Sequence, residues 1–358
     1  MSIIKTTVLK PDRADAWDDY VQTHADAHYC HLFNWSRVIG EVYHHKPFYL
    51  AAVIRQSAGS QKEEAICGIF PLFRFNALTR KPKFISIPFF DQTGILAKNH
   101  AVESVLFAKA IELIENKGAS GLEIRQAVPS AFSELLCQKN LRSNVSSIKV
   151  SLKVKLGQTH EEMMQKFKSK LRSQIKKGMK NGLESRIGKQ ELMDPFYTVF
   201  SKNMRDLGSP VHSKKLFHSI FKYFYRDAFI CVVTYQSQPV AAGFMFRFKS
   251  EISNPWASSL REFRHLNTNM FLYWKMIRFA CNLGLDRFDM GRSSFGASTY
   301  LFKKQWDPEE KQLYWYNWYL DGKQNKVKPE SLHIRHWNRL PLVAANSLGP
   351  LVRRNISL

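Results

Sequence analysis

The sequence is poor in the features that mark membrane, fibrous and disulfide-rich proteins. Its 358 residues contain no apolar run of the about 18–20 residues that a membrane span needs. With only 17 glycines, the chain cannot be collagen-like. Its aromatic content of 13% is higher than that of a disordered chain. The first residues lack the long apolar segment of a secretory signal, so we expect none. The five cysteines form no CxxC pair and the histidines show no ligand spacing, which argues against a disulfide scaffold and a metal site.

Acidic residues are also scarce. The chain has 30 Asp and Glu against 53 Lys and Arg, which gives a formal net charge of +23. A surface of this sign attracts phosphates, nucleic acid or an anionic membrane leaflet, and charge alone does not choose among them. We therefore expect a cytoplasmic protein with an anionic partner. The length exceeds what one hydrophobic core usually serves, which predicts two domains.

One order of elements occurs twice along the chain. Each half is predicted to contain a strand hairpin, a third strand, a helix, a glycine and a short strand. In the first half these elements lie at 48–55, 65–75, 84–90, 101–116 and 122–125, and a further helix is predicted at 129–140. In the second half they lie at 229–235, 239–248, 253–259, 268–283, with Thr268 or Asn269 as N-cap, and 287–290. The order predicts a duplicated mixed α/β unit with its boundary near 146–157.

A lysine-rich helical insertion is predicted between the halves, at 159–227. Thr159 and Glu162 form a capping box at its start. Between Lys166 and Lys189 there are nine cations and one anion. A solvated helix face is the ordinary explanation of a charge run, but like charges at this spacing destabilise a helix unless something anionic relieves them. We therefore expect this helix to bind a polyanion.

Several segments resemble the FemAB-like acyltransferases, and within them the FemAB-related proteins associated with the XrtA/PEP-CTERM exosortase system. The segments that carry the resemblance are 170–183, 204–211, 255–259, 269–274, 288–294 and 300–306. The resemblance implies an α/β (α+β) protein with tandem GNAT-like acyltransferase domains and a helical insertion. It would place the N-terminal domain at 1–150, the C-terminal domain with the insertion at 151–325, and a tail at 326–358.

The resemblance also implies a function. The best-studied relatives move an amino acid from aminoacyl-tRNA to an amine on a peptidoglycan precursor. For this chain we expect acyl or aminoacyl transfer to an amine on an exopolysaccharide or envelope precursor, with aminoacyl-tRNA or an acyl thioester as donor and no tightly bound cofactor. The partner would be a nucleotide-linked or lipid-linked sugar, or tRNA, which would allow peripheral contact with the inner membrane. The alternative is a non-catalytic accessory factor that binds nucleic acid or an anionic lipid-linked glycan through the basic helix.

Three residues are expected to be catalytic. The pair Phe302-Lys303 matches a family pair whose lysine faces the reaction centre and the substrate phosphate, and Phe302 is expected to line the substrate. Lys303 and Lys304 lie about 100° apart on a helix, so only one of them points inward. Asp91 matches a family position proposed as a base, although a turn acid is the usual explanation of such a residue. Asp289 is predicted to end a strand.

The remaining candidates are expected to bind substrate. Arg292 would project near the end of the strand that carries Asp289, or make a local turn contact with it. The lysine-rich helix adds the candidates Arg172, Lys176 and Lys177. The predicted strand-to-helix connection and its flanks add Trp256, Arg261, Asn269 and Tyr273. Arg205 would bind substrate or cap a helix with Asp206. The loop at 260–270 lacks the glycine-rich pattern that holds the pyrophosphate of coenzyme A, so we expect no standard acetyl-CoA site there; Arg261, Arg264 and His265 could hold phosphate instead.

The tail contains an apolar stretch at 340–352. Its thirteen residues are too few to span a bilayer. The stretch either packs on the body of the protein or lies at a membrane interface, and of the two we favour packing.

Overall fold

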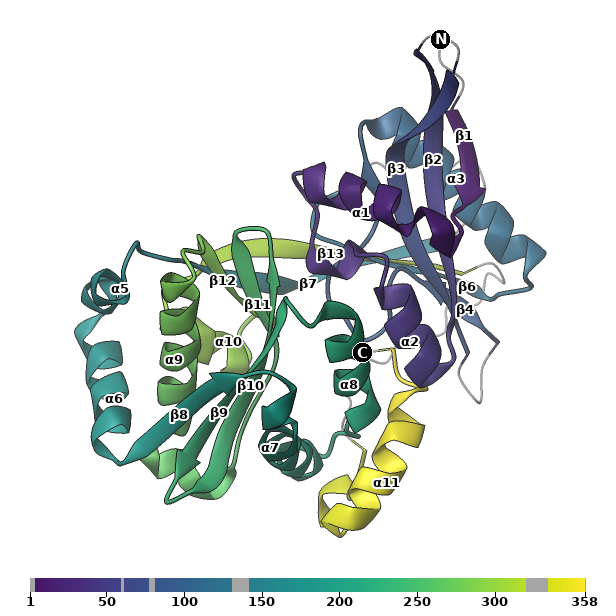
Figure 1. Cartoon of the computed structure of the whole chain (residues 1–358). Coiled ribbons are helices and arrows are strands. Elements are labelled where there is room, and N and C mark those ends of the chain that lie inside the picture. Colours follow the sequence, from purple (N-terminus) through teal and green to yellow (C-terminus); the bar gives the residue numbers. More distant parts are fainter. Residues whose placement is uncertain (1–3, 59–60, 77–80, 131–141, 320–333, 358) are drawn as a thin grey trace. The chain divides into compact units, whose positions relative to one another are not determined.

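The computed structural model describes residues 4–58, 61–76, 81–130, 142–319 and 334–357 (Figure 1). The chain forms two compact units. The first comprises Met1–Ile148, Gln312–Glu330 and Asn355–Leu358, and the second Lys149–Lys311 and Ser331–Arg354. Each unit is therefore built from segments distant in the sequence, whereas the sequence suggested consecutive ranges. The reason lies in strand β13 (Glu309–Tyr319), which pairs with β6 (Gly121–Gln126) of the first unit.

The first unit is a twisted sheet covered on both faces. Its strands follow the order β1, β2, β3, β4, β6 and β13, antiparallel except for the parallel pair β4–β6. The bounds not yet given are β1 (Ile4–Val8), β2 (Lys46–Ala58), β3 (Gln61–Phe75), β4 (Lys83–Ile85) and the short β5 (Leu96–Ala97). The helices are α1 (Ala14–Thr23), α2 (Trp35–Tyr43) and α3 (His100–Asn116).

Alternation along β2 shows how the two faces are filled. Leu50 and Ala52 lie in one buried cluster with the α3 residues Val102 and Leu106. Tyr49, which directly precedes Leu50, points to the other face, where its ring lies 4.7 Å from that of Trp17 in α1. Successive strand residues point to opposite faces, so both faces of this strand are buried.

The second unit repeats this arrangement. Its strands follow the order β7, β12, β11, β10, β9 and β8, with the parallel pair β11–β12 among antiparallel neighbours. Their bounds are β7 (Arg142–Lys155), β8 (Leu183–Gly188), β9 (Ala228–Tyr235), β10 (Gln238–Phe248), β11 (Glu251–Ser259) and β12 (Arg287–Ser294). The helices are α5 (His160–Lys166), α6 (Ser169–Lys180), α7 (Met193–Asp206), α8 (Lys214–Phe224), α9 (Thr268–Asn282), α10 (Ser298–Lys304) and α11 (Leu342–Arg353).

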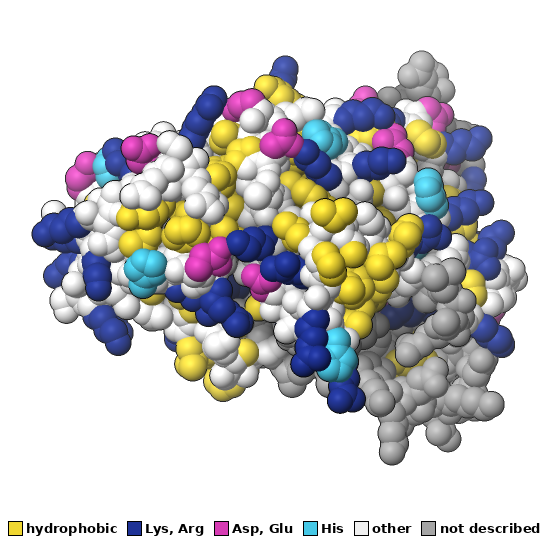
Figure 2. All heavy atoms as spheres, turned by 90° about the horizontal axis from the view of Figure 1, so that it is seen from below, with side chains coloured by type: hydrophobic (Ala, Val, Ile, Leu, Met, Phe, Trp, Pro, Cys, Tyr) yellow, Lys and Arg dark blue, Asp and Glu magenta, His cyan; other side chains and the backbone are white. Residues whose placement is uncertain are grey.

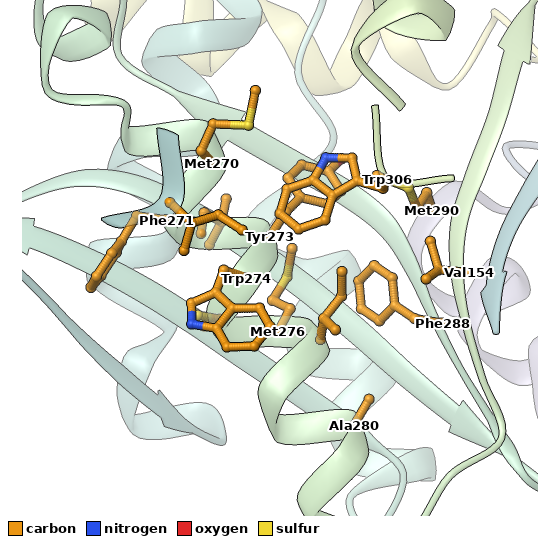
Figure 3. Packing of buried hydrophobic residues seen from close by; sticks show 14 of the residues in the cluster. Val154, Met270, Phe271, Tyr273, Trp274, Met276, Ala280, Phe288, Met290 and Trp306 are labelled. Atoms are coloured by element: carbon orange, nitrogen blue, oxygen red, sulfur yellow. The ribbon is translucent and has the colours of Figure 1, made fainter. Parts of the chain in front are cut away.

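Helix α9 is the centre of the second unit's core. It lies on one face of the sheet with α6 outside it, while α7 and α8 cover the other face (Figure 1). A Cβ atom on Gly243 of β10 would lie 2.5 Å from the sulfur of Met276, so this glycine lets α9 approach the sheet closely. Figure 3 shows Tyr273 and Met276 of α9 packed beside Phe288 of β12.

The duplication predicted from the sequence is confirmed element by element. Apart from the short β5 before α3, the series β2, β3, β4, α3, β6 and the series β9, β10, β11, α9, β12 have the same order. In both, two antiparallel pairings are followed by one parallel pairing across the helix. Each helix is followed by a glycine in the left-handed region, Gly118 at φ 60° and Gly284 at φ 67°.

Several local predictions were wrong. The insertion is not wholly helical, since strand β8 lies inside it and pairs with β9. Its lysine-rich part is two helices, because Phe167 is extended at the end of α5. The N-cap of α9 is Asn267, at φ 62°, and not Thr268 or Asn269. The third strand of the first half ends early, with β4 at Lys83–Ile85. The helix predicted at 129–140 falls almost entirely outside the described residues. None of the helices in the described part of the chain has the length and apolar character of a bilayer span.

Candidate functional site

Strands β11 and β12 separate after three paired residues. Their parallel pairing runs only from Glu251 opposite Arg287 to Ser253 opposite Asp289. Beyond that point β11 continues along β10 to Ser259, and β12 continues along β7. The carboxyl ends of the two parallel strands therefore diverge, and the backbone groups that would have joined them are not used for that pairing. We call this place the fork. Ligands of open α/β sheets bind where the carboxyl ends of parallel strands diverge.

Bulges on both strands produce the fork. In β11, Asn254 and Pro255 together face the single residue Met245 of β10. In β12, the register against β7 shifts between Asp289 and Arg292, and Gly291 there has φ 71°. A bulge bends its strand and increases the local twist, and glycine accepts the left-handed conformation without strain. The two strands are thus bent at the same level of the sheet.

Asn254 is buried at the bulge of β11. Its amide nitrogen donates to the carbonyl oxygens of Phe244 at 2.8 Å and Trp256 at 3.0 Å, which fixes the side chain across the bulge. Its side-chain oxygen is buried and has no hydrogen-bond partner among the described residues. Buried acceptors are nearly always satisfied, so this oxygen is suited to a donor supplied by a ligand. Sequence reasoning missed Asn254, since nothing in its neighbourhood distinguishes it from a strand residue.

Lys303 lies at the bulge of β12. It is 8% exposed, and its Nζ donates to the carbonyl oxygens of Gly291 at 3.1 Å and Arg292 at 2.8 Å. Lys304 is the outward member of the pair and binds Glu310 at 2.6 Å. Helix α10 therefore places one of its two adjacent lysines beside the fork and the other on the surface. The catalytic role of Lys303 stays a prediction.

Asp289 lies inside β12 and not at its end, because the strand continues to Ser294. Its buried carboxylate accepts the amide N–H of Gly291 at 2.7 Å and the hydroxyl of Ser151 at 3.3 Å. The carboxylate therefore stabilises the bulge whose carbonyl groups hold Lys303. Asp289 and Arg292, which were predicted from one segment, and Lys303, which was predicted from another, come together at this bulge.

A charge cluster that the sequence did not reveal lies at the closed end of the fork. Lys153 of β7 binds both carboxylate oxygens of Glu251, at 2.8 and 2.7 Å, and lies 3.8 Å from Asp289. Burial alone would lower the pKa of Lys153, but the carboxylates of Asp289 and Glu251 raise it overall. Burial, and then repulsion from Asp289, raises the pKa of Glu251. These residues meet only through strand pairing, so no sequence spacing signals them.

The three basic residues predicted to bind phosphate together have different roles in the structure. Arg172 donates to the carbonyl oxygens of Gln165 at 3.1 Å and Phe167 at 2.7 Å, and so caps the end of α5. Lys176 and Lys177 are exposed, and neither forms an ion pair with any described residue. Of these three residues, Lys176 and Lys177 are therefore the ones exposed to a phosphate ligand.

Helix α6 brings these lysines to the start of α9. A Cβ atom on Gly178 would lie 3.1 Å from Cβ of Phe271, so the two helices touch at this glycine. Asn181 donates to the carbonyl oxygen of Leu266 at 3.1 Å, just before α9 begins. We define the basic surface as the exposed cations of α6 and of the 3₁₀ turn before α9, namely Lys176, Lys177, Lys180, Arg261 and Arg264. A helix N-terminus adds positive potential at the same place.

Three predicted substrate residues, Trp256, Tyr273 and Phe302, belong to the hydrophobic packing. The ring of Trp256 lies 5.1 Å from that of Phe217, on the face that α7 and α8 cover. Tyr273 packs against Phe302 at 5.1 Å between ring centres, and burial raises the pKa of Tyr273. These aromatic residues fix α8, α9 and α10 around the sheet.

None of the last three predicted residues, Arg205, Asn269 and Asp91, belongs to β12 or α10. Arg205 pairs with Asp206 at 2.6 Å, ahead of Gly208 at φ 73°, as expected of a helix end. Asn269 is half-buried in the first turn of α9. Asp91 belongs to the first unit, where its carbonyl oxygen accepts a hydrogen bond from the indole of Trp315 at 3.1 Å.

Comparisons with known proteins agree with this architecture. Residues 165–304 match the family described as acetyltransferase (GNAT) domain. The chain has a tandem GNAT fold. Among solved structures it is similar to FemX, with 12% identity, a TM-score of 0.66, and coverage of 87% of this chain and 96% of that one. It is also similar to a tandem GNAT protein from the clavulanic acid biosynthesis pathway, with 8% identity, a TM-score of 0.54, and coverage of 88% and 98%.

A third similar structure is the C-terminal domain of a putative lysylphosphatidylglycerol synthetase from Agrobacterium fabrum. Here the identity is 13%, the TM-score is 0.54, and the coverage is 86% of this chain and 92% of that one. No match was found among the curated proteins. At these identities the likeness concerns the fold, and it confirms the fold class that was predicted from the sequence.

Proposed function

We propose that this chain is an N-acyltransferase that moves an acyl or aminoacyl group onto an amine, with the fork of the second unit as its site. The observation that carries the proposal is the fork itself, lying within the segment that matches a GNAT domain. The strand bulges that bound the fork carry a buried cation, Lys303, held at the bulge of β12, and a buried acceptor without a partner among the described residues, Asn254, in the bulge of β11.

The chemistry requires little beyond these groups. The amine nitrogen attacks the carbonyl carbon of the donor, a C–N bond forms, and the C–O bond of an aminoacyl ester or the C–S bond of a thioester breaks. The amine loses a proton and the leaving oxygen or sulfur gains one. A fixed cation stabilises the negative charge that develops on the carbonyl oxygen. We assign this role to Lys303, because its ammonium group is held in one place by two carbonyl oxygens.

The two aspartates are assigned different parts. Asp289 accepts the amide of Gly291, whose carbonyl group in turn holds Lys303, so we assign Asp289 to positioning the cation. Asp91 remains the proposed base, on the resemblance alone. Asp91→Asn tests this, since a base that removes the amine proton contributes about 100-fold or more to the rate.

The basic surface supports a donor or acceptor with phosphate groups. Its five exposed cations belong to α6 and to the turn before α9, and that turn contains no glycine that would let a backbone cradle close on a pyrophosphate. We therefore favour aminoacyl-tRNA over a coenzyme A thioester as donor. One similar structure is named as a putative lysylphosphatidylglycerol synthetase, which supports aminoacyl transfer to a phosphate-bearing acceptor within this fold. For this chain we propose a nucleotide-linked or lipid-linked sugar of the exopolysaccharide or envelope pathway, in the XrtA/PEP-CTERM context that the sequence suggests.

One observation favours a second function, a non-catalytic accessory factor that binds a polyanion. The exposed lysines of α6 lack ion pairs with described residues, and this would be so whether or not the fork is catalytic. A binding protein would need the basic surface but not the buried Lys303.

The test separates transfer from binding. Mixed radiolabelled aminoacyl-tRNAs, and separately labelled acetyl-CoA, are incubated with the protein and an extract of envelope precursors. Transfer to an amine converts a base-labile ester or thioester into a base-stable amide, which is counted after mild alkaline treatment. We expect base-stable label from aminoacyl-tRNA, and its loss in Lys303→Met but not in Lys304→Met. If tRNA binds while neither donor yields base-stable label, the accessory-factor function replaces this one.

A further inference from the structure

Helix α11 presents three of its large apolar side chains outward. Val343 is 79% exposed, Leu351 57% and Leu348 47%. The side that it buries carries the small residues Ala345 and Gly349. A helix packed on a globular protein normally does the reverse, with its apolar stripe turned inward and polar residues in the water.

The outward orientation is fixed by specific contacts within the second unit. A Cβ atom on Gly349 would lie 2.9 Å from a methyl group of Val211, so only a glycine permits this close approach. Arg353 donates from Nε to Nε2 of His212 at 3.1 Å, and both residues are buried. The helix therefore cannot roll to bury its leucines without breaking these contacts.

Basic residues border the exposed face. Arg335, His336 and Arg339 are exposed just before α11, and Arg354 follows it. The sequence from 334 to 358 contains no aspartate or glutamate. Seen from the side on which α11 lies, the molecule shows a patch of hydrophobic side chains with Lys, Arg and His side chains beside it (Figure 2).

Two more exposed apolar side chains lie at the end of α7 and in the segment before α11. Leu207 is 40% exposed and Ile334 37%. The amide of Ile334 donates to the carbonyl oxygen of Gly208 at 2.9 Å, so the segment before α11 is joined to the end of α7. We define the α11 face as Leu207, Ile334, Val343, Leu348 and Leu351.

We propose that the α11 face seats on the surface of an anionic lipid bilayer, with the helix lying in the interface. Apolar side chains of this size enter the boundary between headgroups and acyl chains, and arginines at the rim pair with anionic headgroups. With 12 residues the helix is about 18 Å long, which suits lying in the interface and is too short to cross a core of about 30 Å.

The other occupants fit less well. A second copy of the chain would bring the same arginines against themselves, and five side chains fall short of the about 800 Å² per partner that a stable interface buries. Nucleic acid would pair with the arginines but not with exposed leucines. The proposal does not depend on the proposed transfer reaction, because the surface would bind lipid in a catalytically inactive protein too.

The experiment uses the full chain and vesicle flotation. Vesicles of phosphatidylcholine alone are compared with vesicles in which one third is phosphatidylglycerol. We expect binding to the anionic vesicles, and at least about tenfold weaker binding for Val343→Ser/Leu348→Ser/Leu351→Ser, because each substitution removes an inserted apolar side chain. Leu283→Ser, at an exposed leucine after α9, is the matched control and should bind as the wild type does.

Two further variants make the outcome decisive. Arg335→Gln/Arg339→Gln should reduce binding to anionic vesicles, whereas Lys176→Ala/Lys177→Ala on the basic surface should leave most of it. Equal binding by the triple serine variant and the wild type would overturn the proposal, as would binding lost only with the α6 lysines. A concentration-dependent dimer that the triple variant abolishes, without vesicle binding, would assign the α11 face to a second copy.

Discussion

The sharpest test of the candidate site replaces Lys303 by methionine. Methionine keeps most of the apolar stem but removes the ammonium group and its hydrogen bonds to the carbonyl oxygens of Gly291 and Arg292. Lys304→Met is the matched control, because this neighbouring lysine lies on the surface and binds Glu310. The pair therefore compares a positioned cation with an equal loss of charge from the same helix.

In Lys303→Met the loss of stability should be small and the loss of turnover large. Hydrogen bonds from a charged donor contribute about 1.5–3 kcal/mol each, but the variant no longer has to bury an ammonium group, so we expect a net loss of about 1–3 kcal/mol in stability. For a domain of this size that lowers the melting temperature by about 2–4 °C for each kcal/mol. The loss of a positioned charge beside the developing oxyanion should cost about 100-fold or more in turnover, well beyond what a folded but slightly destabilised protein would lose.

The assay measures base-stable label transferred from aminoacyl-tRNA, at a temperature well below the melting temperature of both variants. We expect Lys303→Met to be folded and nearly inactive, and Lys304→Met to be close to the wild type. Equal losses in both variants would mean that general positive charge is needed and not a positioned group. Normal turnover in Lys303→Met would refute the catalytic assignment and leave Lys303 as a structural clasp on the β12 bulge.

Three further predictions concern the basic surface, pH and the donor. Arg172→Ala should lower the melting temperature, because it removes the cap of α5. Lys176→Ala/Lys177→Ala should keep the melting temperature of the wild type but bind tRNA more weakly, with a smaller dependence of the affinity on salt. Thermal melts and a filter-binding salt series test both variants, and wild-type affinity for tRNA in the double variant would contradict the prediction. Burial, and then the charge of Arg353, hold the pKa of His212 well below its usual 6.5, so the unfolded chain takes up the proton first. Stability should thus fall below about pH 6.5 by up to about 1.4 kcal/mol per pH unit, and urea titrations of the wild type and His212→Gln should show this slope only in the wild type. Calorimetry with acetyl-CoA should show nothing tighter than roughly millimolar, about 4 kcal/mol of binding free energy, and micromolar binding would restore coenzyme A as donor.

Apolar periodicity predicted the parts of the fold that are buried on both sides. Strands β9 and β10 and helix α9 were found at nearly their observed bounds, because their residues pack on neighbours along most of their length. Strand β8 was missed for the opposite reason. In Leu183–Gly188 only Leu183 is fully buried, since the strand lies at the edge of the sheet, and an edge strand need not carry an apolar pattern.

The candidate site was only partly accessible from the sequence. Lys303 was found through the resemblance, and helical geometry showed that it and Lys304 point in different directions. Asn254, Lys153 and Glu251 were not found, because each becomes a candidate only through register: a bulge buries the first, and cross-strand pairing brings the other two to Asp289. Charge counting also failed to separate Arg172 from its neighbours, since composition does not tell which guanidinium group binds the backbone.

Gly178 shows how a locally unfavourable residue can be explained by packing. A glycine inside a helix costs about 1 kcal/mol relative to alanine, so by propensity alone Gly178 weakens the lysine-rich helix. In the structure the missing side chain lets α6 approach Phe271 and the carbonyl group of Asn267, so the two helices touch. That contact brings the lysine-bearing helix α6 against the start of α9. The basic surface is thus produced by tertiary packing: the cations were visible in the sequence, but the glycine that brings them together looked like a defect.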